Sequence, residues 1–124
     1  MLHTETVEPG TFSLLKELMA FPSLGSFSLV GGTALALRFG HRSSVDLDLF
    51  FHEKFDQPHI ISELESEFGE RFAYKHQHTH FGIFCFIDNI KVDLVYFPHL
   101  PICPTEVIHG IRFYSNADLS LIHI

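Results

Sequence analysis

The chain has 124 residues, of which 46% are hydrophobic, and a formal net charge of −7 at pH 7. This length and apolar content suit one domain with a single core, and no apolar run reaches the roughly 18 residues of a membrane-spanning helix. The acidic balance argues against broad electrostatic capture of nucleic acid. With no apolar segment following its acidic first residues, the chain is expected to be cytoplasmic, without a membrane partner.

The first half of the chain predicts three helices and two strands. Apolar residues at helical spacing predict a helix over 11–21, with Thr11 or Ser13 as its cap. Residues 27–30 predict a short strand, followed by two glycines and a helix over 33–39 that ends at Gly40. Apolar and acidic residues alternate over 45–51, which predicts a strand with two different faces, and a helix follows over 58–68.

The second half is rich in predicted strands, over 71–78, 80–87, 90–97 and 108–114. Asp88 and Asn89 tolerate positive φ and predict a two-residue turn between the second and third of these strands. A last helix begins at Asn116 or Asp118. The phenylalanines of 81–87 are expected in the core. The pattern predicts an α/β (α+β) class, with a mixed β-sheet flanked by helices in a single domain over residues 1–124.

Three aspartates in predicted strands form the first candidate site. Asp46 and Asp48 are two residues apart, so in a strand they share a face, with Cα atoms roughly 6.5–7 Å apart. Two such carboxylates repel each other, and a divalent ion relieves that repulsion. Asp93 interrupts another apolar strand pattern and could complete a metal site or accept a proton from a hydroxyl. For any one of these aspartates, a solvated strand face is the alternative interpretation.

A glycine turn precedes the first two aspartates. Gly31, Gly32 and Thr33 lie between a predicted strand and a predicted helix. Glycines let the backbone approach a ligand closely, and the free N–H groups of a helix start favour phosphate. A glycine pair alone is weak evidence, but its combination with two aspartates about a dozen residues later predicts a nucleotide site.

The run LVGGTALALRFGHRSSVDLDLF resembles the nucleotidyltransferase superfamily that includes DNA polymerase beta. It is most similar to the AbiEii/AbiGii toxin family of bacterial toxin–antitoxin systems, whose Arg-x-Ser-x-Asp-x-Asp pattern is matched by Arg42, Ser44, Asp46 and Asp48. The resemblance implies the nucleotidyltransferase fold over this chain. Family members usually continue into a helical C-terminal part with a further Lys and Asp, and this sequence ends at Ile124, before such a part.

The resemblance also implies a reaction. Asp46, Asp48 and Asp93 would hold Mg²⁺ or Mn²⁺, Asp93 alternatively activating the acceptor hydroxyl. Gly31, Gly32 and Thr33 would bind the phosphates, and Arg42 and Ser44 would contact the leaving pyrophosphate. The implied partners are an NTP, an acceptor hydroxyl on RNA such as tRNA or on protein, and a cognate antitoxin. The alternative is a catalytically inactive nucleotide-binding or partner-binding module with the same fold.

Other polar residues leave alternatives open. His76, His78 and His80 alternate along a predicted strand, where they form either a polar face or, if one strand holds all three, a transition-metal site. His41 and Arg38 either contact a ligand or are structural.

Overall fold

A computed structural model describes residues 2–40, 45–75 and 79–121. Its helices are α1 (Pro9–Met19), α2 (Gly31–Phe39), α3 (Gln57–Phe68) and α4 (Asn116–Leu121), with 3-10 turns at Thr4–Thr6, Pro22–Leu24 and Gly69–Arg71. Its strands are β1 (Ser28–Val30), β2 (Leu47–Phe51), β3 (Phe72–Tyr74), β4 (Gly82–Ile87), β5 (Ile90–Tyr96), β6 (Glu106–Ile108) and β7 (Ile111–Phe113). The predicted mixed α/β class is confirmed. Among the described helices, none is long and apolar enough to cross a membrane.

The described strands form one sheet in the order β3-β4-β5-β2-β1-β7-β6. β2 is parallel to β5 and β1 is parallel to β7, whereas the other neighbouring pairs are antiparallel. The predicted turn at Asp88 and Asn89 is confirmed, because both residues have positive φ, 55° and 64°. The single strand predicted over 108–114 is wrong. His109 and Gly110 have φ of 51° and 80° and turn the chain between β6 and β7.

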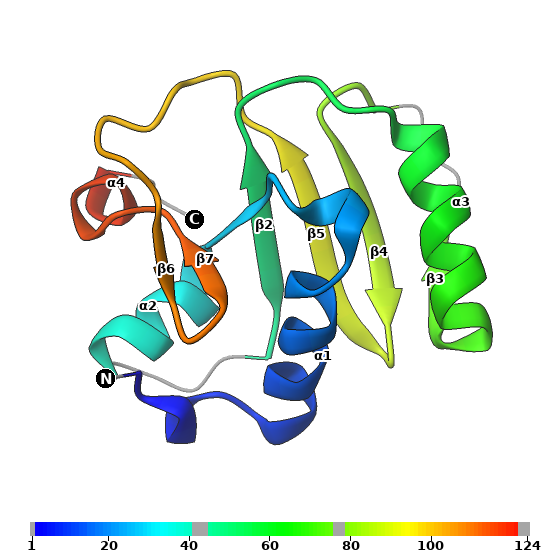
Figure 1. The fold of residues 1–124 in the computed structure, drawn as a ribbon. Coiled ribbons are helices and arrows are strands. Elements are labelled where there is room, and N and C mark those ends of the chain that lie inside the picture. The colour runs from blue at the N-terminus through cyan, green and yellow to red at the C-terminus, as the bar shows by residue number, and fades with distance from the viewer. Residues whose placement is uncertain (1, 41–44, 76–78, 122–124) are drawn as a thin grey trace.

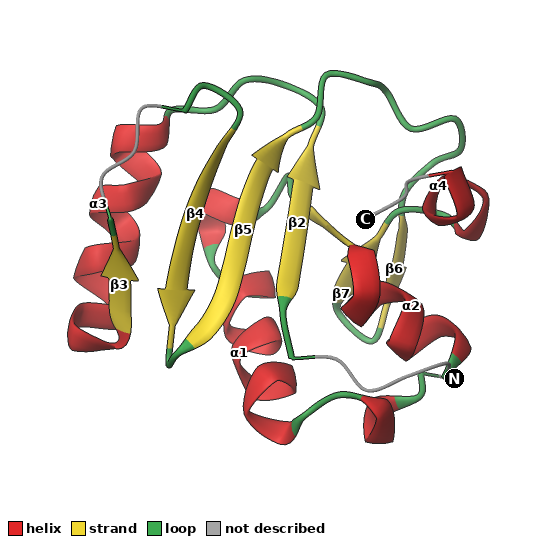
Figure 2. Cartoon of the chain, turned by 180° about the vertical axis from the view of Figure 1, so that it is seen from behind, coloured by secondary structure: helices red, strands yellow, loops and turns green. Residues whose placement is uncertain are grey.

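The helices lie on both faces of the sheet. α1 and α3 cover one face, and α2 and α4 lie on the other, near β7 (Figures 1 and 2). From behind, β4 and β5 have no described helix in front of them, and α2 lies to one side of β2 (Figure 2). The sheet therefore has one closed face, and a second face that its described helices leave largely open.

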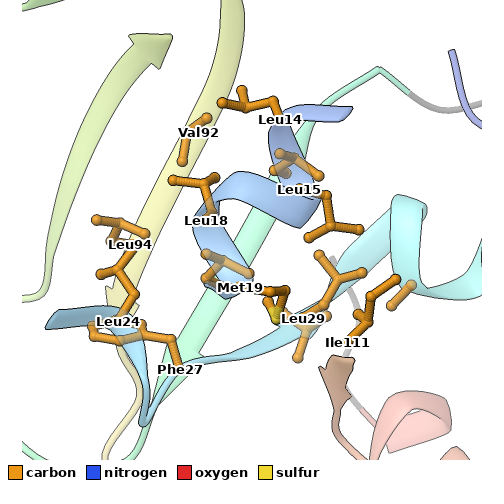
Figure 3. Packing of buried hydrophobic residues seen from close by; sticks show 14 of the residues in the cluster. Leu14, Leu15, Leu18, Met19, Leu24, Phe27, Leu29, Val92, Leu94 and Ile111 are labelled. Carbon is orange, nitrogen blue, oxygen red and sulfur yellow. The ribbon is translucent and has the colours of Figure 1, made fainter. Parts of the chain in front are cut away.

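The closed face carries the core beneath α1. Leucines and Met19 of this helix pack on Leu29, Val92 and Leu94 (Figure 3). The helix begins two residues before the predicted start because Glu8, rather than Thr11 or Ser13, is its cap: the Glu8 carboxylate accepts a hydrogen bond from the Thr11 N–H at 3.0 Å. This helix thereby buries one apolar stripe against the middle of the sheet.

Arg112 of β7 connects distant parts of the chain. Its guanidinium donates to the carbonyl oxygens of Phe27 at 2.8 Å, Leu24 at 2.9 Å and Met19 at 3.1 Å. Burial lowers the pKa of Arg112, but these carbonyls satisfy its donors. The Arg112 side chain therefore ties the connection from α1 to β1 to the C-terminal hairpin.

We expect Arg112→Met to lower the free energy of unfolding by about 3 kcal/mol, because it removes a charged donor from three partly buried carbonyls, of which that of Leu24 keeps only the Phe27 N–H. Urea unfolding followed by circular dichroism measures this change. Arg71→Met is the matched control: Arg71 pairs with Glu17 and Asp88 at an exposed position, where solvent screening should make the loss clearly smaller than that of Arg112→Met. Equal losses in the two variants would contradict the structural role of Arg112.

Candidate active site

Asp48 and Asp93 lie side by side on neighbouring strands. β2 and β5 run parallel, and their register places Asp48 directly opposite Asp93. Asp93 is only 7% exposed, and Asp48 is partly buried. The structure therefore brings together two of the three predicted carboxylates, from segments 45 residues apart in the sequence.

The start of α2 lies directly against this carboxylate pair. Gly31 has a φ of +75°, and a Cβ atom built on it would lie 2.4 Å from Asp48 Oδ2. Any side chain at this position would collide with the carboxylate. Gly31 is thus required both by its backbone conformation and by the close approach of Asp48. The predicted glycine turn and the predicted aspartate strand meet at this contact.

Asp46 lies outside the strand that was predicted to hold it. The strand begins at Leu47 rather than Val45, so Asp46 lies before β2, and it is exposed. Its carbonyl accepts a hydrogen bond from the Thr33 hydroxyl, which ties this segment to α2. In the described part of the chain, no three His, Cys, Asp or Glu side chains are grouped closely enough to hold a metal ion.

The same hydrogen bond changes what Thr33 can offer a ligand. Thr33 is fully buried, and its hydroxyl is directed to the Asp46 backbone. The side chain therefore positions the segment that leads into β2. Phosphate binding at this turn would then depend on backbone N–H groups in the first turn of α2, such as those of Gly31 and Gly32.

The electrostatics of the pair are unfavourable. Burial raises the pKa of Asp48 to about 6, and the negative charge of Asp93 adds to the increase. A helix start normally favours a carboxylate, but here desolvation and like charge dominate. Full ionisation of the pair is therefore unfavourable, although the charge of Lys91 offsets part of this cost.

Lys91 is a residue of the site that the sequence reasoning did not identify. Its Nζ lies 3.1 Å from Asp93 Oδ2, and this hydrogen bond, with the charge of Asp93, raises the pKa of Lys91. Lys91 is two residues before Asp93 in β5, so the two side chains share a face. That same-face spacing was the available signal in the sequence.

The other carboxylate oxygen of Asp93 accepts nothing from the described residues. Asp93 Oδ1 is buried and has no hydrogen-bond partner among them. A buried carboxylate oxygen without a partner is rare, and a bound ion or water is one way to satisfy it. Two carboxylates, with substrate phosphates and water, are a ligand set that Mg²⁺ accepts, so the pair fits this ion.

The remaining predicted residues divide into three groups. Five of them lie outside the described residues, so their predicted roles stay predictions: His41, Arg42, Ser44, His76 and His78. His80 is described and is exposed. Arg38 forms an ion pair with Glu106 at 3.0 Å and lies over the Phe113 ring, but its Nη1 is buried without a hydrogen-bond partner among the described residues, so both interpretations of Arg38 stay open. The phenylalanines of 81–87 are not all in the core, as Phe81 is 57% and Phe86 49% exposed.

We expect Gly31→Ala to destabilise the protein by several kcal/mol, about 2–4, because the added Cβ is strained and collides with Asp48. Gly110→Ala is the matched control, since Gly110 has a φ of +80° and nothing within 4 Å of a built Cβ. Chemical denaturation should show a loss of only about 1 kcal/mol for the control. If the added Cβ collides with the Asp48 carboxylate, Asp48→Ala should partly relieve the cost of Gly31→Ala. Additive losses of stability in this double-mutant cycle would refute the collision.

We expect Asp48→Asn to stabilise the protein at pH 7.5 in EDTA by roughly 1–2 kcal/mol. The pKa of Asp48 is raised to about 6 in the folded state, so its contribution to stability is full below about pH 4 and is lost as the pH rises through 6. The gain from Asp48→Asn should therefore disappear below about pH 4. Denaturant unfolding between pH 4 and 8 measures it, with the exposed Glu70→Gln as control. A gain that is constant with pH would contradict this account.

Comparison with known proteins places this geometry in a family. Residues 13–109 match the family described as nucleotidyl transferase AbiEii toxin, type IV TA system. An uncharacterised Aquifex aeolicus protein, aq_aa25, is 35% identical over 79 residues, which are 62% of this chain and 37% of the relative.

Solved structures agree in fold. TM1012 of Thermotoga maritima, a candidate nucleotidyltransferase, aligns with a TM-score of 0.64 at 17% identity, covering 93% of this chain and 83% of its own. A candidate nucleotidyltransferase of Helicobacter pylori aligns at 0.54 and 18% identity, covering 90% and 56%. The chain thus spans 37% of the curated relative and 56% of the Helicobacter structure. Because the family match covers most of the sequence, including Gly31, Asp48 and Asp93, the chain belongs to the AbiEii nucleotidyltransferase toxin family.

Proposed function

We propose that the chain carries the catalytic site of a cytoplasmic, divalent-metal-dependent nucleotidyltransferase, which moves a nucleoside monophosphate from an NTP to an acceptor hydroxyl. The observation that carries this proposal is the convergence of Asp48, Asp93 and Gly31 at one point. A buried carboxylate pair beside a glycine-started helix combines a cation site with a phosphate site.

Each group has a role in this proposal. Asp48 and Asp93 would hold Mg²⁺ or Mn²⁺, with Asp46 adding negative charge at the rim. The metal, when bound, would neutralise charge on the phosphates and on the leaving pyrophosphate. N–H groups at the start of α2 would bind the phosphate oxygens, and Arg42 and Ser44 would contact the pyrophosphate.

The transfer is an in-line displacement. The acceptor oxygen forms a bond to the α-phosphorus while the bond from that phosphorus to the bridging oxygen breaks, and pyrophosphate leaves with the electron pair. As the alternative to binding the metal, Asp93 would accept the proton of the acceptor hydroxyl. The chain's main contribution is to position the reactants and hold charges in place, which these residue types can do.

The acceptor and partners follow from the family. We propose an acceptor on RNA, such as a tRNA end, or on protein, and a cognate antitoxin that counters the toxin activity. A second candidate function is nucleotide or partner binding without transfer. The exposed position of Asp46, outside β2, favours this second candidate because it leaves two carboxylates rather than three in the site.

We expect the chain to bind NTP in the presence of Mg²⁺ and to label an acceptor when incubated with each α-labelled NTP and pools of cellular RNA and protein. Asp48→Asn combined with Asp93→Asn should lower both readouts about a hundredfold or more, because the metal-binding carboxylates are lost. Calorimetry and gel autoradiography measure them.

Glu70→Gln, an exposed charge change away from the site, should change neither readout. Unchanged NTP affinity in the double variant would refute the metal assignment. Label on neither pool, with NTP binding intact, would favour the binding module.

A further inference from the structure

We propose that Lys91 is a built-in competitor for the divalent ion, so that its ammonium group sets the metal concentration at which the site is occupied. This inference rests on the proposed function, because it takes Asp48 and Asp93 as the metal-binding carboxylates. It goes further by assigning a role to a residue that the sequence motif does not contain.

The first support is the contact itself. Lys91 Nζ lies 3.1 Å from Asp93 Oδ2, so the ammonium is bound to one of the two carboxylates that the metal would need. Asp93 Oδ1 is buried and has no partner among the described residues. A divalent ion would therefore meet one Asp93 oxygen without a partner among the described residues and one that is already paired with a cation.

The second support is that all three aspartates interact electrostatically with Lys91. Besides Asp93, the charges of Asp48 and Asp46 also act on Lys91. A divalent ion held by Asp48 and Asp93 would lie close to the Lys91 ammonium. Because the two positive charges repel each other, the ammonium would have to move away when the ion binds. Binding of the metal and retention of the Lys91 contact are therefore antagonistic.

The third support is that Lys91 can move. Its side chain is 50% exposed, whereas that of Asp93 is 11% exposed. A lysine side chain is flexible and strongly hydrated, so it can exchange the carboxylate for water at small cost. Asp93 is held in β5 between β2 and β4 and stays in place.

The test is metal binding measured without any turnover. We expect Lys91→Met to bind Mn²⁺ about five- to tenfold more tightly than wild type, because the competing ammonium is removed. Electron paramagnetic resonance measures the unbound Mn²⁺, and Mg²⁺ affinity follows by competition. Lys91→Arg keeps the charge and should stay within roughly twofold of wild type.

Lys54→Met is the matched control, because it removes the same charge from an exposed loop position. Lys91→Gln repeats the neutralisation with a polar side chain, in case Lys91→Met fails to fold. Affinity equal to or weaker than that of Lys54→Met, in either neutral variant, would overturn the inference and leave the proposed function intact. Absence of Mn²⁺ binding to the wild type would overturn the metal assignment together with the inference.

Discussion

The placement of two carboxylates directly opposite each other on β2 and β5 is the constraint on which the rest of the site depends. Like charges at opposed positions destabilise a sheet, so this register needs support from elsewhere. The support lies on the other face of the same strands. Leu47, Leu49, Val92 and Leu94 are fully buried there, and a shift of one residue would expose them and bury the aspartates in the core. The hydrophobic core thus imposes the position of the charges.

The same constraint explains the glycine. Once the core fixes Asp48, its carboxylate occupies the space where a Cβ at the start of α2 would be. Only glycine satisfies both the positive φ and the contact. β1 is short, and its last residue, Val30, pairs with Asp48, so the helix begins directly beside the carboxylate. The proposed phosphate-binding turn and the proposed cation site are therefore one unit.

Much of this could be predicted from the sequence because the signals are local. The alternation of apolar and acidic residues identified β2, and Asp88 with Asn89 identified the β4–β5 turn. The position of Asp46 could not be predicted, because β2 begins only where its pairing with β5 begins, at Leu47, and because the Thr33 hydroxyl bonds the backbone carbonyl of Asp46, 13 residues away. The turn at His109 and Gly110 was missed because it lacks the Asn-Gly or Asp-Gly pattern of the favoured hairpins.

Stability and function oppose each other at this site. Burial and the charge of Asp93 raise the pKa of Asp48, so the folded protein at neutral pH holds a carboxylate that would be more stable protonated. A single lysine offsets part of that cost by pairing with Asp93, and it does so from an exposed position. Full neutralisation by a buried arginine would stabilise the fold more and would also occupy both oxygens of Asp93. Partial compensation by a mobile cation is therefore the arrangement that keeps the fold stable and leaves the carboxylates able to bind a ligand.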